Sequence, residues 1–133
     1  MTWLYESQPF EDPSDWYGFV YRITHTPTGR KYIGRKYFTQ AGYKQVKGKR
    51  KKTRKESNWK EYWGSSKYLQ ADVEKYGKEE FSREIIRLCK NRSECSYYET
   101  KAIFDENALL SEEYYNHWVA CKITEVQVKA IKK

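Results

Sequence analysis

A glutamate lies where the sequence pattern predicts an apolar side chain. Apolar residues recur at i, i+3, i+7 and i+8 and predict a helix over residues 93–108, capped by its first residue. At about 100° per residue, Glu99 falls in the middle of its apolar face, and Glu106 lies on the same side two turns later. Burying an unpaired charge is costly, so Glu99 requires a partner. Two interpretations stay open: a salt bridge to a strand arginine such as Arg22 or Arg83, or a metal ligand or acid–base group facing a sheet.

Two tyrosines precede this helix in a predicted β-hairpin. Residues 17–24 alternate with strand periodicity, residues 26–29 (TPTG) supply a turn, and residues 31–34 form a second short strand. A four-residue connection places Tyr21 and Tyr32 on the same face of the sheet. A loop one residue longer or shorter would put them on opposite faces, so the pairing depends on register.

Two cations follow the second of these strands. Arg35 and Lys36 leave the strand end beside Tyr32, where positive charge would favour a phenolate and could bind a phosphate. A carboxylate, two phenols and two cations around a sheet could assemble a metal-dependent phosphodiesterase. In that hypothesis the metal binds the glutamate, a tyrosine is the base and an arginine stabilises charge.

The remaining elements form a small mixed domain. A short helix is predicted over residues 59–63, a second over residues 67–76 that ends at Gly77, and a strand over residues 81–88. The order β, β, α, α, β, α predicts an α+β fold in which helices cover a small sheet. The periodicity of residues 119–131 favours neither helix nor strand.

The net charge of +8 on 133 residues is concentrated in one segment. Eight of the 26 Lys and Arg lie between positions 44 and 55, which leaves 18 to balance the 18 Asp and Glu elsewhere. This basic arm consists of Lys44, Lys47, Lys49, Arg50, Lys51, Lys52, Arg54 and Lys55. Such a block is typical of a solvated arm with a polyanionic partner. A solubilising loop and, for residues 49–52, a nuclear-localisation signal are the alternatives.

Composition excludes several classes of protein. No apolar run approaches the length of a membrane span, and the N-terminus lacks the features of a signal peptide, so we expect a cytoplasmic protein without a membrane partner. Cys89, Cys95 and Cys121 are an odd number at irregular spacing, which favours reduced, mostly buried thiols over disulfides. No CxxC pair accompanies the two histidines, so a zinc site is disfavoured.

Several segments, in order, resemble the GIY-YIG nuclease family. Residues 19–23 (FVYRI) and 31–34 (KYIG) are similar to the two halves of its signature, with the ten-residue interval that the family shows between Tyr21 and Tyr32. Further segments resemble phage-encoded free-standing homing endonucleases, at residues 62–67, 75–81, 98–99 and 114–116. The resemblance covers residues 17–116. Phe19 departs from it by standing in place of the signature's first glycine.

The resemblance implies a fold and a set of roles. The fold is a three-stranded antiparallel sheet flanked by helices. Tyr21 would be the general base, helped by Tyr32, Glu99 would bind one Mg²⁺ or Mn²⁺, and Asn116 would support the site or contact the phosphate. A family arginine, often accompanied by a histidine, has no direct counterpart after the second half-motif. We therefore assign its phosphate-stabilising role to Arg35 and Lys36, with Arg54 and Lys60 as alternatives.

The resemblance also implies a domain division and a function. Residues 1–16 are expected to be an irregular lead-in, residues 17–118 a nuclease domain with a basic insertion at 35–57, and residues 119–133 a C-terminal extension. The expected activity is that of a one-metal, Mg²⁺-dependent endonuclease that acts on double-stranded DNA. The protein would come from a phage or mobile element, and the resemblance is compatible with a dimer. The basic arm would be flexible and bind the DNA backbone with little base readout. The alternatives are a catalytically silent nucleic-acid-binding protein and an RNA-directed nuclease.

Overall fold

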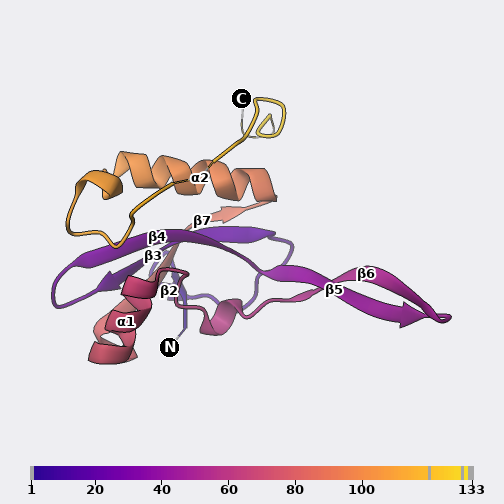
Figure 1. The fold of residues 1–133 in the computed structure, drawn as a ribbon, viewed down its shortest axis with the longest axis horizontal. Helices are drawn as coiled ribbons and strands as arrows, with labels where there is room; N and C mark the ends of the chain where they lie inside the picture. The colour runs from indigo at the N-terminus through magenta and orange to yellow at the C-terminus, as the bar shows by residue number, and fades with distance from the viewer. Residues whose placement is uncertain (1, 120, 130, 132–133) are drawn as a thin grey trace.

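A five-stranded mixed sheet forms the centre of the protein (Figure 1). The structure is a computed structural model that describes residues 2–119, 121–129 and 131. The strand order is β2-β1-β7-β3-β4, in which β3 pairs antiparallel with both β4 and β7. The strands are β1 (Leu4–Tyr5), β2 (Gln8–Pro9), β3 (Gly18–His25), β4 (Arg30–Tyr37) and β7 (Phe81–Cys89). The α+β class is confirmed, and the predicted three antiparallel strands are the middle and one edge of a larger sheet.

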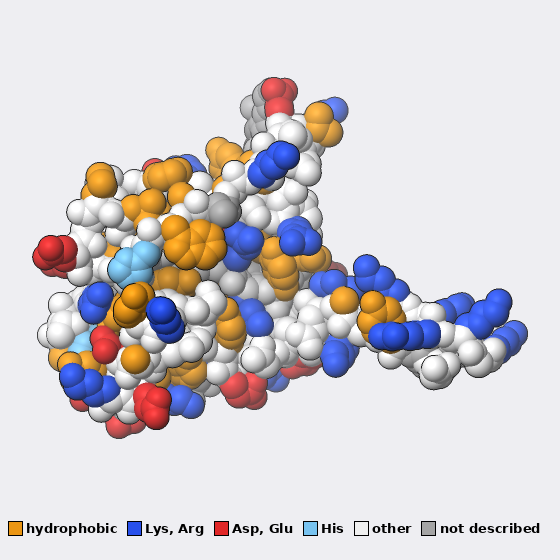
Figure 2. All heavy atoms as spheres, in the orientation of Figure 1, with side chains coloured by type: hydrophobic (Ala, Val, Ile, Leu, Met, Phe, Trp, Pro, Cys, Tyr) orange, Lys and Arg blue, Asp and Glu red, His pale blue; other side chains and the backbone are white. Residues whose placement is uncertain are grey.

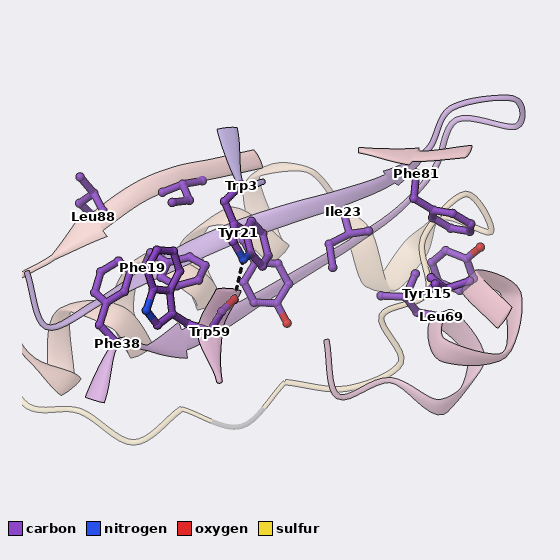
Figure 3. Packing of buried hydrophobic residues seen from close by; sticks show 12 residues of the cluster. Trp3, Phe19, Tyr21, Ile23, Phe38, Trp59, Leu69, Phe81, Leu88 and Tyr115 are labelled. Carbon is purple, nitrogen blue, oxygen red and sulfur yellow. Dashed lines mark hydrogen bonds between the residues drawn. The ribbon is translucent and has the colours of Figure 1, made fainter. Parts of the chain in front are cut away.

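Residues 1–16 were expected to be an irregular lead-in, but this segment contains two short strands. These are β1, which pairs parallel with β7, and β2, which pairs antiparallel with β1. Trp3 anchors this segment, because its ring is buried against Phe19 and Tyr21. Its indole Nε1 donates a hydrogen bond of 2.7 Å to the carbonyl oxygen of Trp59 (Figure 3). Two-residue strands carry too little periodicity to be found in the sequence.

The predicted hairpin of β3 and β4 is confirmed in its register. Ile23 is the partner of Tyr32, and Tyr21 is the partner of Gly34, so both tyrosines lie on one face of the sheet as expected. The connecting turn ends at Gly29, whose φ of +75° suits glycine. Arg35 lies within β4 rather than beyond its end, because the strand continues to Tyr37.

Apolar residues pack on both faces of the sheet. One face carries an aromatic cluster that includes Phe19, Tyr21, Phe38 and Trp59 (Figure 3). The other face is covered by α2 (Arg92–Asp105) and carries a smaller cluster of Val20, Ile33, Cys89, Cys95, Ile103 and Ala108. Cys89 and Cys95 are buried free thiols as predicted, whereas Cys121 is exposed. The sheet therefore separates a large aromatic core from the α2 side.

The helices lie close to their predicted positions. Helix α1 (Lys67–Tyr76) spans the predicted residues and ends at Gly77 as predicted, and the side chain of Ser66 caps its first turn. Helix α2 is capped by the side chain of Asn91, so it begins before the predicted Ser93 cap. The described residues also contain three short 3-10 helices: η1 (Trp59–Glu61), η2 (Lys78–Glu80) and η3 (Ala108–Leu110). Among the described residues, no helix is long and apolar enough to cross a membrane.

The basic arm forms a second, two-stranded sheet and is not the flexible segment that we expected. Strands β5 (Thr39–Val46) and β6 (Lys49–Glu56) pair antiparallel over their whole length. They are joined by Lys47 and Gly48, whose φ values are +51° and +74°, as in the two-residue turns that match strand twist. Every residue of β6 is exposed. Strand β6 was not predicted, because its residues are almost all charged and do not alternate between apolar and polar.

Candidate active site

A cavity of about 630 Å³ opens beside β4, the edge strand of the main sheet. Five of the predicted site residues line it: Tyr21, Tyr32, Arg35, Glu99 and Asn116. They come from β3, β4, α2 and the segment that follows η3. Residues separated by up to 95 positions in the sequence are thus brought to one place because β4 lies between the aromatic core and α2.

Gly34 makes room for the phenol of Tyr21 in this cavity. A side chain at Gly34, its partner on β4, would collide with the Tyr21 hydroxyl and come within 3.0 Å of the Tyr32 ring. At Gly64 the φ of +85° favours glycine, and a Cβ there would come within 3.0 Å of the Leu69 side chain but only into ordinary contact with the two tyrosines. The glycine of the second half-motif therefore has a steric reason in this chain.

Burial controls the protonation of the two phenols. It raises the pKa of Tyr21 well above its ordinary value, and Tyr62, Tyr32 and Glu99 act in the same direction. The pKa of Tyr32 is also raised by burial, although a hydrogen bond with Ser65 (3.2 Å) and the charge of Arg35 oppose this. The expected cation effect is outweighed, because moving a phenolate out of water costs more free energy than the charge of Arg35 contributes. Both tyrosines are therefore protonated at neutral pH.

Glu99 forms an ion pair within the site. Its Oε1 accepts a hydrogen bond of 2.6 Å from Nη1 of Arg35, and its side chain is 15% exposed. Burial raises the pKa of Glu99, and the charge and hydrogen bond of Arg35 oppose the shift. The salt bridge predicted for this carboxylate exists, but its partner is neither Arg22 nor Arg83. The partner is itself one of the predicted phosphate-binding residues.

The two arginines proposed as partners are engaged elsewhere. Arg22 pairs with Glu84 at 2.8 Å and with Glu106, which faces Arg22 rather than the cavity. Arg83 donates to the carbonyl oxygen of Tyr62 at 2.7 Å and lies against two tryptophan rings. Arg35 reaches Glu99 because odd-numbered residues of β4 face α2, whereas Tyr32 and Gly34 face the aromatic core.

The donor set fits one divalent cation of the magnesium type. In the part of the chain that the structure describes, no three His, Cys, Asp or Glu side chains converge on one point, so a closed protein cage of that kind is not formed there. Oε2 of Glu99 has no hydrogen-bond partner among the described residues. Mg²⁺ is commonly held by one or two carboxylates together with water and substrate phosphate. Glu99 is the residue that would hold it.

Asn116 is fixed by the main chain of β4. Its Oδ1 accepts from the amide of Ile33 at 3.0 Å, and its Nδ2 donates to the carbonyl of the same residue at 2.8 Å. Beside it, the amide of Lys31 donates to the carbonyl of Glu113, and the amide of Tyr115 donates to the carbonyl of Lys31. These contacts favour a supporting role, since they hold the β4 edge between Tyr32 and Gly34.

The other predicted cations lie away from the cavity lining. The Lys36 ammonium lies 4.2 Å from the centre of the Tyr62 ring, and burial lowers its pKa. Arg54 donates to the side chain and carbonyl of Thr39 at the root of the basic arm. Lys60 lies over the Trp59 ring. The geometry leaves Arg35 as the predicted cation that lines the cavity.

The cavity lining also includes residues that were not predicted as site residues, among them Ser65, Lys67, Tyr68, His117 and Trp118. Lys67 and Tyr68 belong to the first turn of α1, which was predicted only as a helix. His117 and Trp118 directly follow Asn116, and Trp118 is 74% exposed at the cavity. The Tyr68 and His117 rings meet edge to face at 4.9 Å. The sequence signal that could have identified His117 and Trp118 is that they directly follow the predicted site residue Asn116.

Comparison with known proteins agrees with this geometry. A family model described as "Putative endonuclease segE, GIY-YIG domain" matches residues 3–119. The chain is 34% identical over 100 residues to "Putative endonuclease segE" of Enterobacteria phage T4, a match that covers 75% of this chain and 40% of that protein. It thus spans about two fifths of the length of this relative. No solved structure matches the chain significantly. The match over residues 3–119 and the resemblance of the two half-motifs agree: the chain belongs to the GIY-YIG family.

Proposed function

We propose that this protein is a Mg²⁺-dependent endonuclease that hydrolyses phosphodiester bonds of double-stranded DNA by a one-metal mechanism. The observation that carries the proposal is the convergence of Tyr21, Tyr32, Arg35 and Glu99 on one open cavity. Two protonatable phenols, a guanidinium and a carboxylate together supply the acid–base, anion-binding and metal-binding groups that this reaction needs. The relative's description as an endonuclease supports the same reaction class.

Each residue has a role that follows from its position. Arg35 would bind a phosphate oxygen through guanidinium donors other than the Nη1 that contacts Glu99. Tyr21 Oη would orient the attacking water and accept its proton, and the Tyr32 ring lies 6.2 Å from the Tyr21 ring, centre to centre. When bound at Glu99, Mg²⁺ or Mn²⁺ supplies positive charge that stabilises the charge developing on the phosphate and the leaving oxygen.

The raised pKa of Tyr21 sets a condition on this role. A protonated phenol cannot accept a proton, so the reactive form of the site has lost the Tyr21 proton. A small phenolate fraction at neutral pH means that cleavage should accelerate as the pH rises. The pair of Arg35 and Glu99 must also separate or share its contacts when a phosphate enters, since one guanidinium serves both anions.

The test is cleavage of a supercoiled plasmid with Mg²⁺ and with EDTA, using wild type, Glu99→Gln and Glu74→Gln. Glu99→Gln keeps the shape of the side chain and removes its charge, so we expect the loss of nicked and linear products. Glu74 is exposed on α1, and its substitution should leave cleavage unchanged. Cleavage by Glu99→Gln at the wild-type rate would remove the metal assignment. A duplex RNA of matched sequence, run in parallel, should stay intact.

A further inference from the structure

The hairpin of β5 and β6 projects from the body of the protein, beyond the end of β4 (Figure 1). Lysine and arginine side chains gather along it (Figure 2). From its composition, this basic arm is expected to bind the DNA backbone and to contribute little base readout. The strand pairing indicates a more specific use, which rests on the proposed action on DNA.

The hairpin has two chemically different faces. Cross-strand partners share a face, and successive pairs alternate between faces. The arginine face carries the pairs Thr39–Glu56, Ala41–Arg54, Tyr43–Lys52 and Gln45–Arg50. The lysine face carries Lys49, Lys51 and Lys55, with Gln40, Gly42, Val46 and Thr53. The side chain of Lys44 lies outside the described part of the structure. Both arginines of the hairpin therefore lie on one face, and lysines dominate the other.

Arg50 is held ready to bind along the arginine face. Its guanidinium stacks 3.9 Å from the centre of the Tyr43 ring, which fixes the plane of the group and leaves its edge donors exposed. Among the described residues, Arg50 makes no hydrogen bond or ion pair. Arg54 differs, since its donors are engaged by Thr39. Arg50 is thus available for a ligand, while Arg54 stabilises the root of the hairpin.

The root is anchored to the core, so the hairpin holds a defined direction. Phe38, between β4 and β5, is 1% exposed and packs against Phe19 and Trp59. On the other strand, the amide of Ser57 donates to the carbonyl of Phe38 at 2.9 Å, and its hydroxyl donates to the carbonyl of Tyr37 at 2.6 Å. Both ends of the hairpin are therefore fixed to the sheet that carries the cavity.

The size and chemistry of the hairpin fit the major groove of duplex DNA. This groove is about 12 Å wide and admits a two-stranded β-ribbon. Arginine pairs bidentately with guanine O6 and N7, and glutamine with adenine N6 and N7. Gln45 and Arg50 are direct cross-strand partners, so they can contact neighbouring bases. Lysines on flexible stems can reach the phosphates beside the groove.

We propose that the hairpin enters the major groove with its arginine face toward the bases, where Arg50 reads a guanine and Gln45 an adjacent adenine. The lysine face then supplies phosphate contacts. Ten residues separate Arg35 in the cavity from Gln45, which spans at most about 34 Å along β4 and β5. That is about one turn of B-DNA. The base contacts therefore lie within about ten base pairs of the cleaved bond.

The experiment is selection from a randomised duplex library in EDTA, with the full chain as wild type, Arg50→Lys, Gln45→Ala and Lys51→Ala. Arg50→Lys keeps the charge and removes the bidentate fork, so the guanine preference should fall about tenfold or more while the salt slope of binding stays unchanged. Gln45→Ala should relax the choice of the adjacent base. Lys51→Ala should flatten the slope by about 0.9 and keep the preference.

The outcomes separate this inference from the proposed function. A wild-type library without a preferred base, or an Arg50→Lys variant with the wild-type preference, would overturn base readout even if the protein cleaves DNA. A guanine preference that depends on Arg50 supports the inference even if no cleavage is detected. Tyr43→Phe retains the ring under Arg50 and should keep the preference, whereas Tyr43→Ala should weaken it.

Discussion

The cavity and the β5–β6 hairpin both offer positive charge, but in opposite environments. In the cavity, Arg35 is partly buried and contacts Glu99 at 2.6 Å, beside two phenols whose pKa burial raises. In the hairpin, every residue of β6 is exposed and Arg50 makes no ion pair among the described residues. A few groups held in fixed positions can stabilise a transition state, whereas many exposed charges attract a polyanion through counterion release. The proposed function therefore assigns chemistry to the cavity and attraction of DNA to the hairpin.

Tyr21→Phe should give the largest effect and confine it to the cavity. The change removes one hydroxyl from a buried ring and keeps the aromatic packing, so single-turnover cleavage should fall by about 100-fold or more while duplex binding is unchanged. Tyr97→Phe, at a partly exposed position on α2, is the matched control and should cleave normally. Wild-type cleavage by Tyr21→Phe would exclude Tyr21 as the base.

Gly34→Ala compared with Gly42→Ala tests how differently the two regions tolerate one methyl group. At Gly34 the methyl collides with the buried Tyr21 ring, and we expect a loss of about 1–3 kcal/mol in the free energy of unfolding. At Gly42 the nearest atom is Cδ of the flexible Lys55 side chain at 3.3 Å, so the change should stay within about 1 kcal/mol. Urea unfolding measures both, and equal losses would contradict the steric account of Gly34.

Replacing Lys49, Lys51 and Lys55 together with alanine should weaken binding without altering chemistry. Three lost phosphate contacts should flatten the salt slope of binding by about 2.7, whereas single-turnover cleavage at saturating DNA should match wild type. Binding titrations between low and physiological salt give the slope. If the slope is unchanged, the lysine face is only solubilising.

The pH profile of cleavage tests the cavity without any substitution in wild type, because the only change is the loss of one proton from Tyr21. Because burial raises the pKa of Tyr21, the phenolate is scarce at neutral pH and increases about tenfold for each pH unit below that pKa. Single-turnover cleavage should therefore rise with pH from 7 to 9, and the residual rate of Tyr21→Phe should lose this dependence. A flat wild-type profile would contradict deprotonation of Tyr21 as a requirement.

Local patterns in the sequence were sufficient for much of the fold and for the core of the candidate site. Strand alternation and a four-residue turn predicted the register that places Tyr21 and Tyr32 on one face of the sheet, and the sequence before Gly77 predicted the span of α1. Helical periodicity identified Glu99 as a polar side chain that needs a partner. These predictions succeeded because each rests on a pattern among residues that are close together in the sequence.

The sequence by itself determined which residue types were present: the half-motifs, the out-of-place Glu99 and the concentration of charge in one arm. Only the tertiary structure decided their partners. It paired Glu99 with Arg35 instead of Arg22 or Arg83, joined β1 to β7 and folded the basic arm into a two-faced hairpin. The balance between burial and the charge of Arg35 at Tyr32 also depends on the tertiary structure. The physical reason is that salt bridges, strand pairing and desolvation depend on distances in space, which no local pattern records.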